Sequence, residues 1–184
     1  MKLQQVINGI NVDEMNDLVD RVTSDPELGK FKLRVKNEWV GGTRCRTTID
    51  DFYGMGRQRP HQDIFELQAD EPKELLGTDK GPNATEALLY ALASCLNTTF
   101  ICQAVAEGLE IEQLELDVEG NLDLRGFLGI EEEVRRGYTD IHVTVRAKAD
   151  LPREKLEGLC RLAQKYSPVF DIVTHEVPVT VELE

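Results

Sequence analysis

The fold is decided by residues 81–108, GPNATEALLYALASCLNTTFICQAVAEG. Asn83 is a typical N-cap, and Glu86 follows it at the spacing of a capping box. Residues 87–106 are almost all apolar or small, and Gly108 is a typical stop signal. A helix that is apolar on all sides is normally buried on all sides. We therefore expect the rest of the chain to cover this helix.

The same helix is long enough to cross a membrane, since about 20 residues suffice. However, four polar residues lie near its centre: Asn97, Thr98, Thr99 and Gln103. The chain holds no second apolar stretch of this length. We therefore expect the core helix of a water-soluble protein and no association with a membrane.

Composition places the chain among globular proteins and argues against several partners. Its 184 residues suit one domain, 1–184, with a substantial core. A net charge of −13 argues against nucleic acid and anionic membranes, because both attract basic surfaces. Residues 1–15 lack the apolar region of a signal peptide, so we expect a cytoplasmic protein. The four cysteines and three histidines lack disulfide or zinc spacing, so we expect no metal and no cofactor.

The pattern of the remaining residues predicts an α+β fold with antiparallel sheet. Strands are predicted where apolar and polar residues alternate: 31–36, 43–50, 64–68, 112–124, 141–150 and 177–183. Helices are predicted over 12–22 and 151–166, and a Gly- and Arg-bearing loop over 52–60. A single sheet covers one side of a helix, so a second copy of the chain would have to cover the other side. We therefore expect an intertwined homodimer.

Cys95 is the candidate reactive residue. It lies near the middle of the central helix, and Cys102 lies two turns later on the same face. Most free cysteines in a core behave as small apolar residues, so spacing alone leaves both a reactive thiol and a packing residue open. Cys95 is far from the helix N-terminus, so an activating cation would have to come from another segment.

Three stretches, taken in their order and spacing, resemble the OsmC/Ohr family of osmotically inducible and organic hydroperoxide resistance proteins: Gly81–Cys95, Asp123–Phe127 and Ser167–Val169. The resemblance covers about residues 31–184 and leaves the helix-bearing segment 1–28 outside. It implies an OsmC-like fold, with antiparallel sheets wrapped around two central helices in an intertwined homodimer. It also implies a peroxidase cysteine at Cys95 that attacks an organic hydroperoxide, assisted by a second cysteine, an Arg and a Glu.

The second cysteine of the family usually lies directly before Pro-Val, and that resolving position is Ser167 here. A hydroxyl cannot close a disulfide, so the resemblance is incomplete at this point. If the two helices run antiparallel, Cys102 falls opposite Cys160 and could form another pair. Two buried core cysteines are the simpler interpretation of these thiols.

The resemblance also suggests the assisting residues. Arg44, in the sequence Gly-Gly-Thr-Arg, resembles the Arg of the family's Gly-Gly-Arg turn with one extra residue; the alternatives are Arg46, Arg57 and Arg59. Glu86 is the nearest match to the assisting Glu. Nine residues turn a helix by about 900°, which places Glu86 opposite Cys95 and leaves helix capping as the alternative role.

We therefore expect a thiol-dependent peroxidase that reduces organic hydroperoxides through Cys95. An external thiol would be its reductant, because position 167 carries no thiol. Leu88, Leu92 and Phe100 on the apolar helix would line the substrate pocket. The alternative is a non-catalytic or redox-sensing protein that holds an apolar small molecule in the dimer cleft. Ser167 favours this alternative, whereas Cys95 and the candidate arginines favour the peroxidase.

Overall fold

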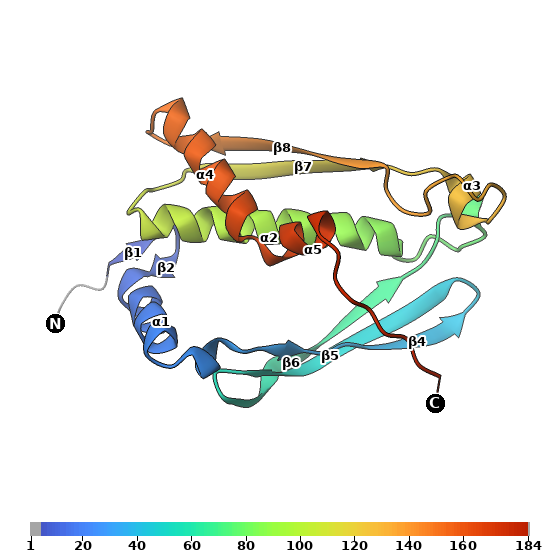
Figure 1. Cartoon of the computed structure of the whole chain (residues 1–184), viewed down its shortest axis with the longest axis horizontal. Coiled ribbons are helices and arrows are strands. Elements are labelled where there is room, and N and C mark those ends of the chain that lie inside the picture. The colour runs from blue at the N-terminus through green and yellow to red at the C-terminus, as the bar shows by residue number, and fades with distance from the viewer. Residues whose placement is uncertain (1–4, 184) are drawn as a thin grey trace. The chain divides into compact units, whose positions relative to one another are not determined.

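The computed structural model describes residues 5–183, which divide into two compact units. The first unit contains Asn11–Ala87, and the second contains Val6–Ile10 and the chain from Leu88 onward. Both units combine helices with antiparallel strands (Figure 1). The expected α+β class is therefore confirmed.

A four-stranded antiparallel sheet forms the body of the first unit. Strand β5 (Arg44–Gly54) is central, with β6 (Arg57–Ala69) on one side and β4 (Lys36–Gly41) and β3 (Lys32–Leu33) on the other. The predicted N-terminal helix is confirmed as α1 (Val12–Ser24), which is followed by a short 3₁₀ turn.

The prediction of a loop over 52–60 is wrong, because β5 and β6 form a hairpin over these residues. Its two turn residues, Met55 and Gly56, both have left-handed backbone, with φ of 52° and 76°. This turn matches the twist of the strands that flank it. Pro60 lies within β6, opposite Asp51 of β5 and next to a register shift between the two strands. At such an irregularity the missing N–H of proline is tolerated.

A buried carboxylate holds the connection from β6 to the central helix. The Asp70 side chain is only 2% exposed, and its oxygens accept hydrogen bonds from the Thr43 and Thr78 hydroxyls at 2.6 Å each. Three backbone N–H groups complete the shell, those of Glu71, Thr78 and Lys80. The hydroxyl donors come first among the causes that hold the pKa of Asp70 far below its usual value.

The central helix α2 (Ala84–Ala106) starts where the sequence predicts. The Asn83 N–H donates to Glu86 Oε2 and the Glu86 N–H donates to Asn83 Oδ1, both at 2.8 Å. The predicted capping box is therefore confirmed. By length and composition alone α2 could cross a membrane, a property that core helices of soluble proteins share.

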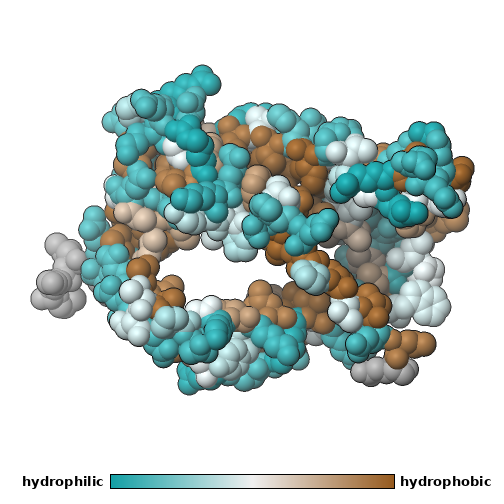
Figure 2. Space-filling model, in the orientation of Figure 1, coloured by the Kyte–Doolittle hydropathy of each residue, from teal (hydrophilic) through white to brown (hydrophobic). Residues whose placement is uncertain are grey.

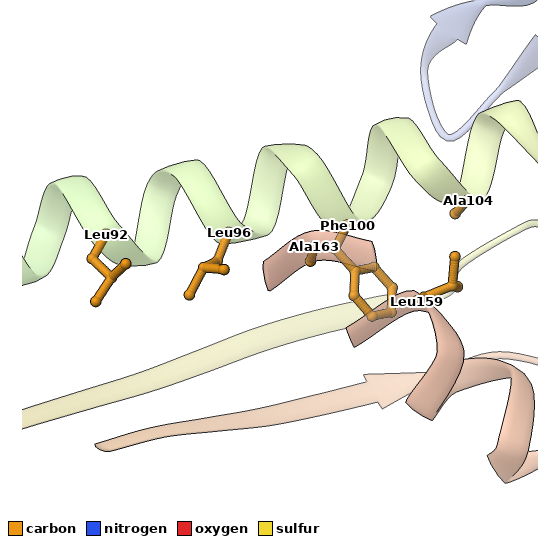
Figure 3. Close-up of a cluster of buried hydrophobic side chains, with 6 residues drawn as sticks. All are labelled: Leu92, Leu96, Phe100, Ala104, Leu159 and Ala163. Atoms are coloured by element: carbon orange, nitrogen blue, oxygen red, sulfur yellow. The ribbon is translucent and has the colours of Figure 1, made fainter. Parts of the chain in front are cut away.

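The second unit packs α2 against a hairpin of β7 (Gln113–Asn121) and β8 (Asp140–Lys148) and against α4 (Arg153–Tyr166). Figure 3 shows the core residues of α2 pointing toward the hairpin and α4: Leu92, Leu96, Phe100 and Ala104. Leu159 and Ala163 of α4 meet them. The buried residues form a stripe on α2, whereas Leu88 and Tyr90 are exposed. Within the second unit, α2 is therefore not buried on all sides.

Two short strands, β1 (Val6–Ile7) and β2 (Ile10–Asn11), form an N-terminal hairpin around Asn8 and Gly9. Both turn residues have positive φ, as the favoured two-residue turn requires. The Asn8 amide donates to the Leu109 carbonyl at 2.9 Å and accepts from the Ile111 N–H at 2.8 Å. One side chain thus attaches the hairpin to the segment that follows α2.

The final strand predicted over 177–183 is wrong for the single chain. After α5 (Pro168–Thr174) the backbone of 175–183 pairs with no strand of the described residues. The alternating apolar side chains are nevertheless present and exposed, from 51% at Val177 to 102% at Leu183. Apolar residues follow the course of this segment in Figure 2. The pattern is that of a strand, but the partner strand is missing.

Candidate active site

Cys95 and Ser167 lie side by side in the second unit, although 72 residues separate them in the sequence. The middle of α2 carries Cys95, and Ser167 is the residue between α4 and α5. The Ser167 Oγ lies 3.1 Å from the Cys95 Sγ as a hydrogen-bond donor. The predicted reactive cysteine and the residue at the predicted resolving position are therefore in direct contact.

The local backbone fixes the direction of the Ser167 hydroxyl. Its N–H donates to the Ala163 carbonyl at 3.0 Å, ending α4, and its Oγ accepts the Phe170 N–H at 3.2 Å as the N-cap of α5. Pro168 follows at the first helical position, which proline favours. Since the oxygen accepts an N–H, its hydrogen is free to be donated to the sulfur. The side chain is 1% exposed, so water does not compete for this hydrogen.

All four cysteines are free, and the alternative pair Cys102 and Cys160 is unbonded in this structure. Burial, and then the charge of Glu157, raises the pKa of the Cys160 thiol. That environment disfavours a thiolate at Cys160. Within residues 5–183, no three His, Cys, Asp or Glu side chains gather as a metal site would require.

Arg44 begins β5 in the first unit, directly after the Gly42-Thr43 turn. Its guanidinium has no carboxylate within salt-bridge distance among the residues described, whereas Arg46 is paired with Glu38 at 3.3 Å. Of the two loop alternatives, Arg59 donates to the Gly54 carbonyl and Arg57 is exposed. Arg44 is thus a candidate cation on this strand that is not already neutralised.

Glu86 uses its carboxylate in the capping box at the start of α2. It stands nine residues before Cys95 on the same helix, so the two side chains leave opposite faces. The structure does not bring Glu86 to the sulfur of Cys95 along this helix. Its capping contacts account for the residue without a catalytic role.

The three predicted pocket residues are buried to different extents on α2. Leu92 and Phe100 are buried in the core, and Leu88 is 39% exposed. A hollow of about 230 Å³ lies among α2, the hairpin, α4 and α5. Of the predicted residues only Phe100 borders it, together with Leu96, Leu116, Ile141, Val143, Val145, Cys160, Ala163, Gln164 and Phe170. Leu96 could have been added from sequence, since it continues the four-residue spacing of Leu92 and Phe100.

The stretch Asp123–Phe127 serves the local fold. Asp123 caps the short α3 (Leu124–Phe127) and pairs with Arg125 at 2.6 Å, and Arg125 also pairs with Glu131 at 2.7 Å. The Arg125 guanidinium lowers the pKa of Asp123. A side chain at Gly126 would come within 2.4 Å of the Arg135 carbonyl oxygen, so only glycine fits there. These contacts hold the loop between β7 and β8 in place.

Solved structures of known proteins share this fold at low sequence identity. The OsmC-like protein of Mycoplasma pneumoniae is 19% identical, with a TM-score of 0.58 over 78% of this chain and 87% of that one. The organic hydroperoxide resistance protein OhrB of Bacillus subtilis is 21% identical, with a TM-score of 0.51 over 83% of this chain and 98% of that one.

An organic hydroperoxide resistance protein OsmC from Legionella pneumophila is 16% identical, with a TM-score of 0.52 over 77% of this chain and 88% of that one. No curated protein matches the sequence. The family model of the OsmC-like proteins matches residues 77–182, more than half of the chain and the whole stretch that carries Cys95 and Ser167. The chain therefore belongs to the OsmC-like protein family.

Proposed function

We propose that the protein reduces organic hydroperoxides as a thiol peroxidase with one catalytic cysteine, Cys95. The observation that carries this proposal is the buried Ser167 hydroxyl that donates to the Cys95 sulfur at 3.1 Å. A hydrogen bond to an ionised acceptor is about twice as strong as one to a neutral group. The contact therefore places a hydrogen-bond donor on the sulfur that would act as the nucleophile. Two structural neighbours that carry the name organic hydroperoxide resistance protein point to the same substrate class.

The Cys95 thiolate attacks the distal oxygen of the hydroperoxide. A sulfur–oxygen bond forms and the oxygen–oxygen bond breaks, so the sulfur becomes a sulfenic acid and the hydroperoxide becomes an alkoxide. The alkoxide takes up a proton and leaves as an alcohol. Arg44 is the residue that we assign to stabilise the thiolate and the leaving alkoxide, because its Gly-Gly-Thr-Arg turn carries the family resemblance and because, unlike Arg46, it has no carboxylate partner among the described residues.

An external thiol completes the cycle, because Ser167 cannot form a disulfide with Cys95. A first thiol displaces water from the sulfenic acid and forms a mixed disulfide, and a second thiol releases Cys95 as the thiol. The apolar hollow bordered by Leu96, Phe100 and Phe170 suits the hydrocarbon part of an organic hydroperoxide. The four free cysteines fit a reducing compartment, and we place the protein in the cytoplasm.

The experiment is intact-mass spectrometry after one equivalent of cumene hydroperoxide, with a sulfenic-acid trap present. The wild-type protein should form a trap adduct, Cys95→Ser should form none, and the matched variant Cys160→Ser should react as the wild type does. A loss of two hydrogens without an adduct would show an internal disulfide and contradict the one-cysteine mechanism. Unmodified wild-type protein would contradict the peroxidase itself.

A second candidate function is a binding protein for an apolar small molecule, in which Cys95 is structural or redox-sensing. The hollow of about 230 Å³, lined mostly by aliphatic and aromatic side chains, favours it. With a structural Cys95, this candidate predicts that an apolar fluorescent probe binds with the same affinity to the wild type and to Cys95→Ser, while the peroxide experiment leaves both proteins unchanged. With a redox-sensing Cys95, the probe result is the same, but the wild type forms the trap adduct.

We propose that the active form is a homodimer. The segment 177–183 has a strand pattern without a partner, and the outer edge of β8 pairs with no strand of the described chain. A hollow of about 540 Å³ is bordered by α4, by Gln113 and Glu115 of β7 and by residues 145–148 of β8. We infer that the C-terminal segment of one copy pairs with β8 of the other.

The dimer is tested by light scattering after size exclusion, with Val179→Glu and Val181→Glu combined in one protein. The wild type should be dimeric and this variant monomeric, because two charges would enter an apolar interface. Thr180→Glu, on the alternate face of the same segment, is the matched control and should stay dimeric. A monomeric wild type would contradict the proposal.

A further inference from the structure

Asp70 directly follows β6 and is one of two buried polar side chains among the described residues. Its five accepted hydrogen bonds come from two separate parts of the first unit. One donor, the Thr43 hydroxyl, belongs to the turn between β4 and β5. The others belong to the connection 71–80, which leads to α2.

The Gly42-Thr43 turn is held at two points. The Trp39 indole N–H donates to the Gly42 carbonyl at 2.9 Å, within the hairpin itself. The Thr43 hydroxyl donates to Asp70 at 2.6 Å, which ties the turn to a distant segment. Gly42 has a φ of 60°, so the turn needs its glycine, and Arg44 is the first residue after it.

The connection 71–82 is closely packed around the same carboxylate. A side chain at Gly77 would lie 1.7 Å from the Glu71 carbonyl oxygen, and one at Gly81 would lie 2.6 Å from that of Gln68. The Asp70 N–H donates to the Pro82 carbonyl at 3.4 Å, next to the N-cap of α2. The carboxylate therefore lies in a closely packed segment, to which the Thr43 hydroxyl attaches the turn.

We infer that Asp70 is a positioning residue, which through the Thr43 hydroxyl fixes the turn that carries Arg44 to the segment that leads into α2. The inference rests on the proposed function, in which Arg44 is the cation that assists Cys95. A short hydrogen bond to a buried carboxylate restrains the residue that donates it. Arg44 is separated from that restraint by a single peptide bond, and it has no carboxylate of its own among the described residues to hold it.

A matched pair of variants tests the inference. Thr43→Val and Thr78→Val each remove one hydroxyl that donates to Asp70 at 2.6 Å, so both should lower the urea midpoint by similar amounts. Only Thr43→Val frees the turn. By hydrogen–deuterium exchange, residues 41–46 should exchange about five- to tenfold faster in Thr43→Val and within about twofold of wild type in Thr78→Val. Unchanged exchange over 41–46 in Thr43→Val would overturn the inference, whether or not the protein is a peroxidase.

The rate of Cys95 oxidation by cumene hydroperoxide gives the second readout. Thr43→Val should slow it about fivefold, Thr78→Val should leave it within about twofold, and Thr43→Ser should retain the wild-type rate. On an Arg44→Ala background, Thr43→Val should cause no further loss, because its effect passes through Arg44. A full additional loss on that background would contradict the inference. An unchanged rate in Arg44→Ala would instead contradict the role of Arg44 in the proposed function.

Discussion

Asp70 and Ser167 are the two buried polar side chains of the described chain, and they are satisfied in different ways. Asp70 receives five hydrogen bonds, which fully occupy the roughly four lone-pair sites of its two oxygens. Ser167 accepts one N–H and gives its only hydrogen to a sulfur. A thiol sulfur is a weak acceptor, whereas a thiolate is a strong one. The saturated group stabilises the fold, whereas the hydroxyl of Ser167 is directed at the sulfur that we propose to react.

The largest effect on stability is expected for Asp70→Asn, because an amide nitrogen would face the donors that the carboxylate now satisfies. Urea unfolding at neutral pH should show a lower midpoint than for any other variant named here. Asp140→Asn is the control, since Asp140 is an exposed carboxylate with two side-chain donors, Asn121 and Thr139. If Asp70→Asn and Asp140→Asn have the same urea midpoint, Asp70 contributes no more to stability than an exposed carboxylate does.

The same carboxylate predicts an acid dependence. Because the folded pKa of Asp70 lies below its unfolded value of about 3.9, its contribution is complete above that pH and is lost as the pH falls below it. Between about pH 5 and pH 2 the urea midpoint of the wild type should fall more steeply than that of Asp70→Asn. Parallel curves for the two proteins would show that Asp70 does not contribute to acid unfolding.

Ser167→Cys should change the product of the peroxide reaction. The present separation of 3.1 Å between Oγ and Sγ is close enough for a sulfur at position 167 to bond to Cys95 at about 2.05 Å. Intact mass after one equivalent of cumene hydroperoxide should show a loss of two hydrogens and almost no trap adduct. Ser94→Cys, which adds a thiol on a different face of α2, should still give the adduct.

Ser167→Ala should slow the oxidation of Cys95 by about three- to tenfold, because the thiolate loses a buried hydrogen-bond donor. Stability should fall by about 1 kcal/mol through the lost N-cap of α5. Ser167→Thr keeps a hydroxyl and should restore most of the rate, which stopped-flow mixing with cumene hydroperoxide would measure. If the alanine variant reacts at the wild-type rate, the hydroxyl is only a helix cap.

The smallest effect is expected for Glu86→Ala, which removes one half of the capping box. Thermal unfolding should report a loss of about 0.5–1 kcal/mol, and the rate of Cys95 oxidation should be unchanged. Glu86→Gln preserves the cap and should match the wild type in both measurements. A slower reaction in the glutamine variant would restore the catalytic role that the family resemblance suggests.

Local chemistry made much of the fold predictable. The Asn83 and Glu86 box depends on a spacing of three residues, and the alternation in β7 and β8 depends on neighbours, so both can be read from sequence. The 52–60 hairpin was not predictable in the same way. Its glycines and Pro60 are typical of a loop, and a turn and a register shift accommodate them within strands.

The limits of prediction were set by partners distant in the chain. The pattern of 177–183 is that of a strand, yet no local rule supplies the strand that it needs. The contact between Cys95 and Ser167 was suggested only through the family resemblance, because 72 residues separate the two. Asp70 gave no signal, since a carboxylate at the end of a strand is normally exposed, and its donors come from residues 43–80.

The turn of the N-terminal hairpin contains an Asn-Gly pair, which is a sequence prone to deamidation. Asn8 precedes Gly9, and in a freely moving chain the glycine nitrogen of such a pair attacks the asparagine side chain and deamidates it. Here both amide atoms are held, one by Leu109 and one by Ile111, so the attack requires the hairpin to open. Each opening that ends in deamidation leaves a carboxylate, which can no longer donate to the Leu109 carbonyl. The fraction of deamidated Asn8 in an aged sample therefore records how often this hairpin has detached.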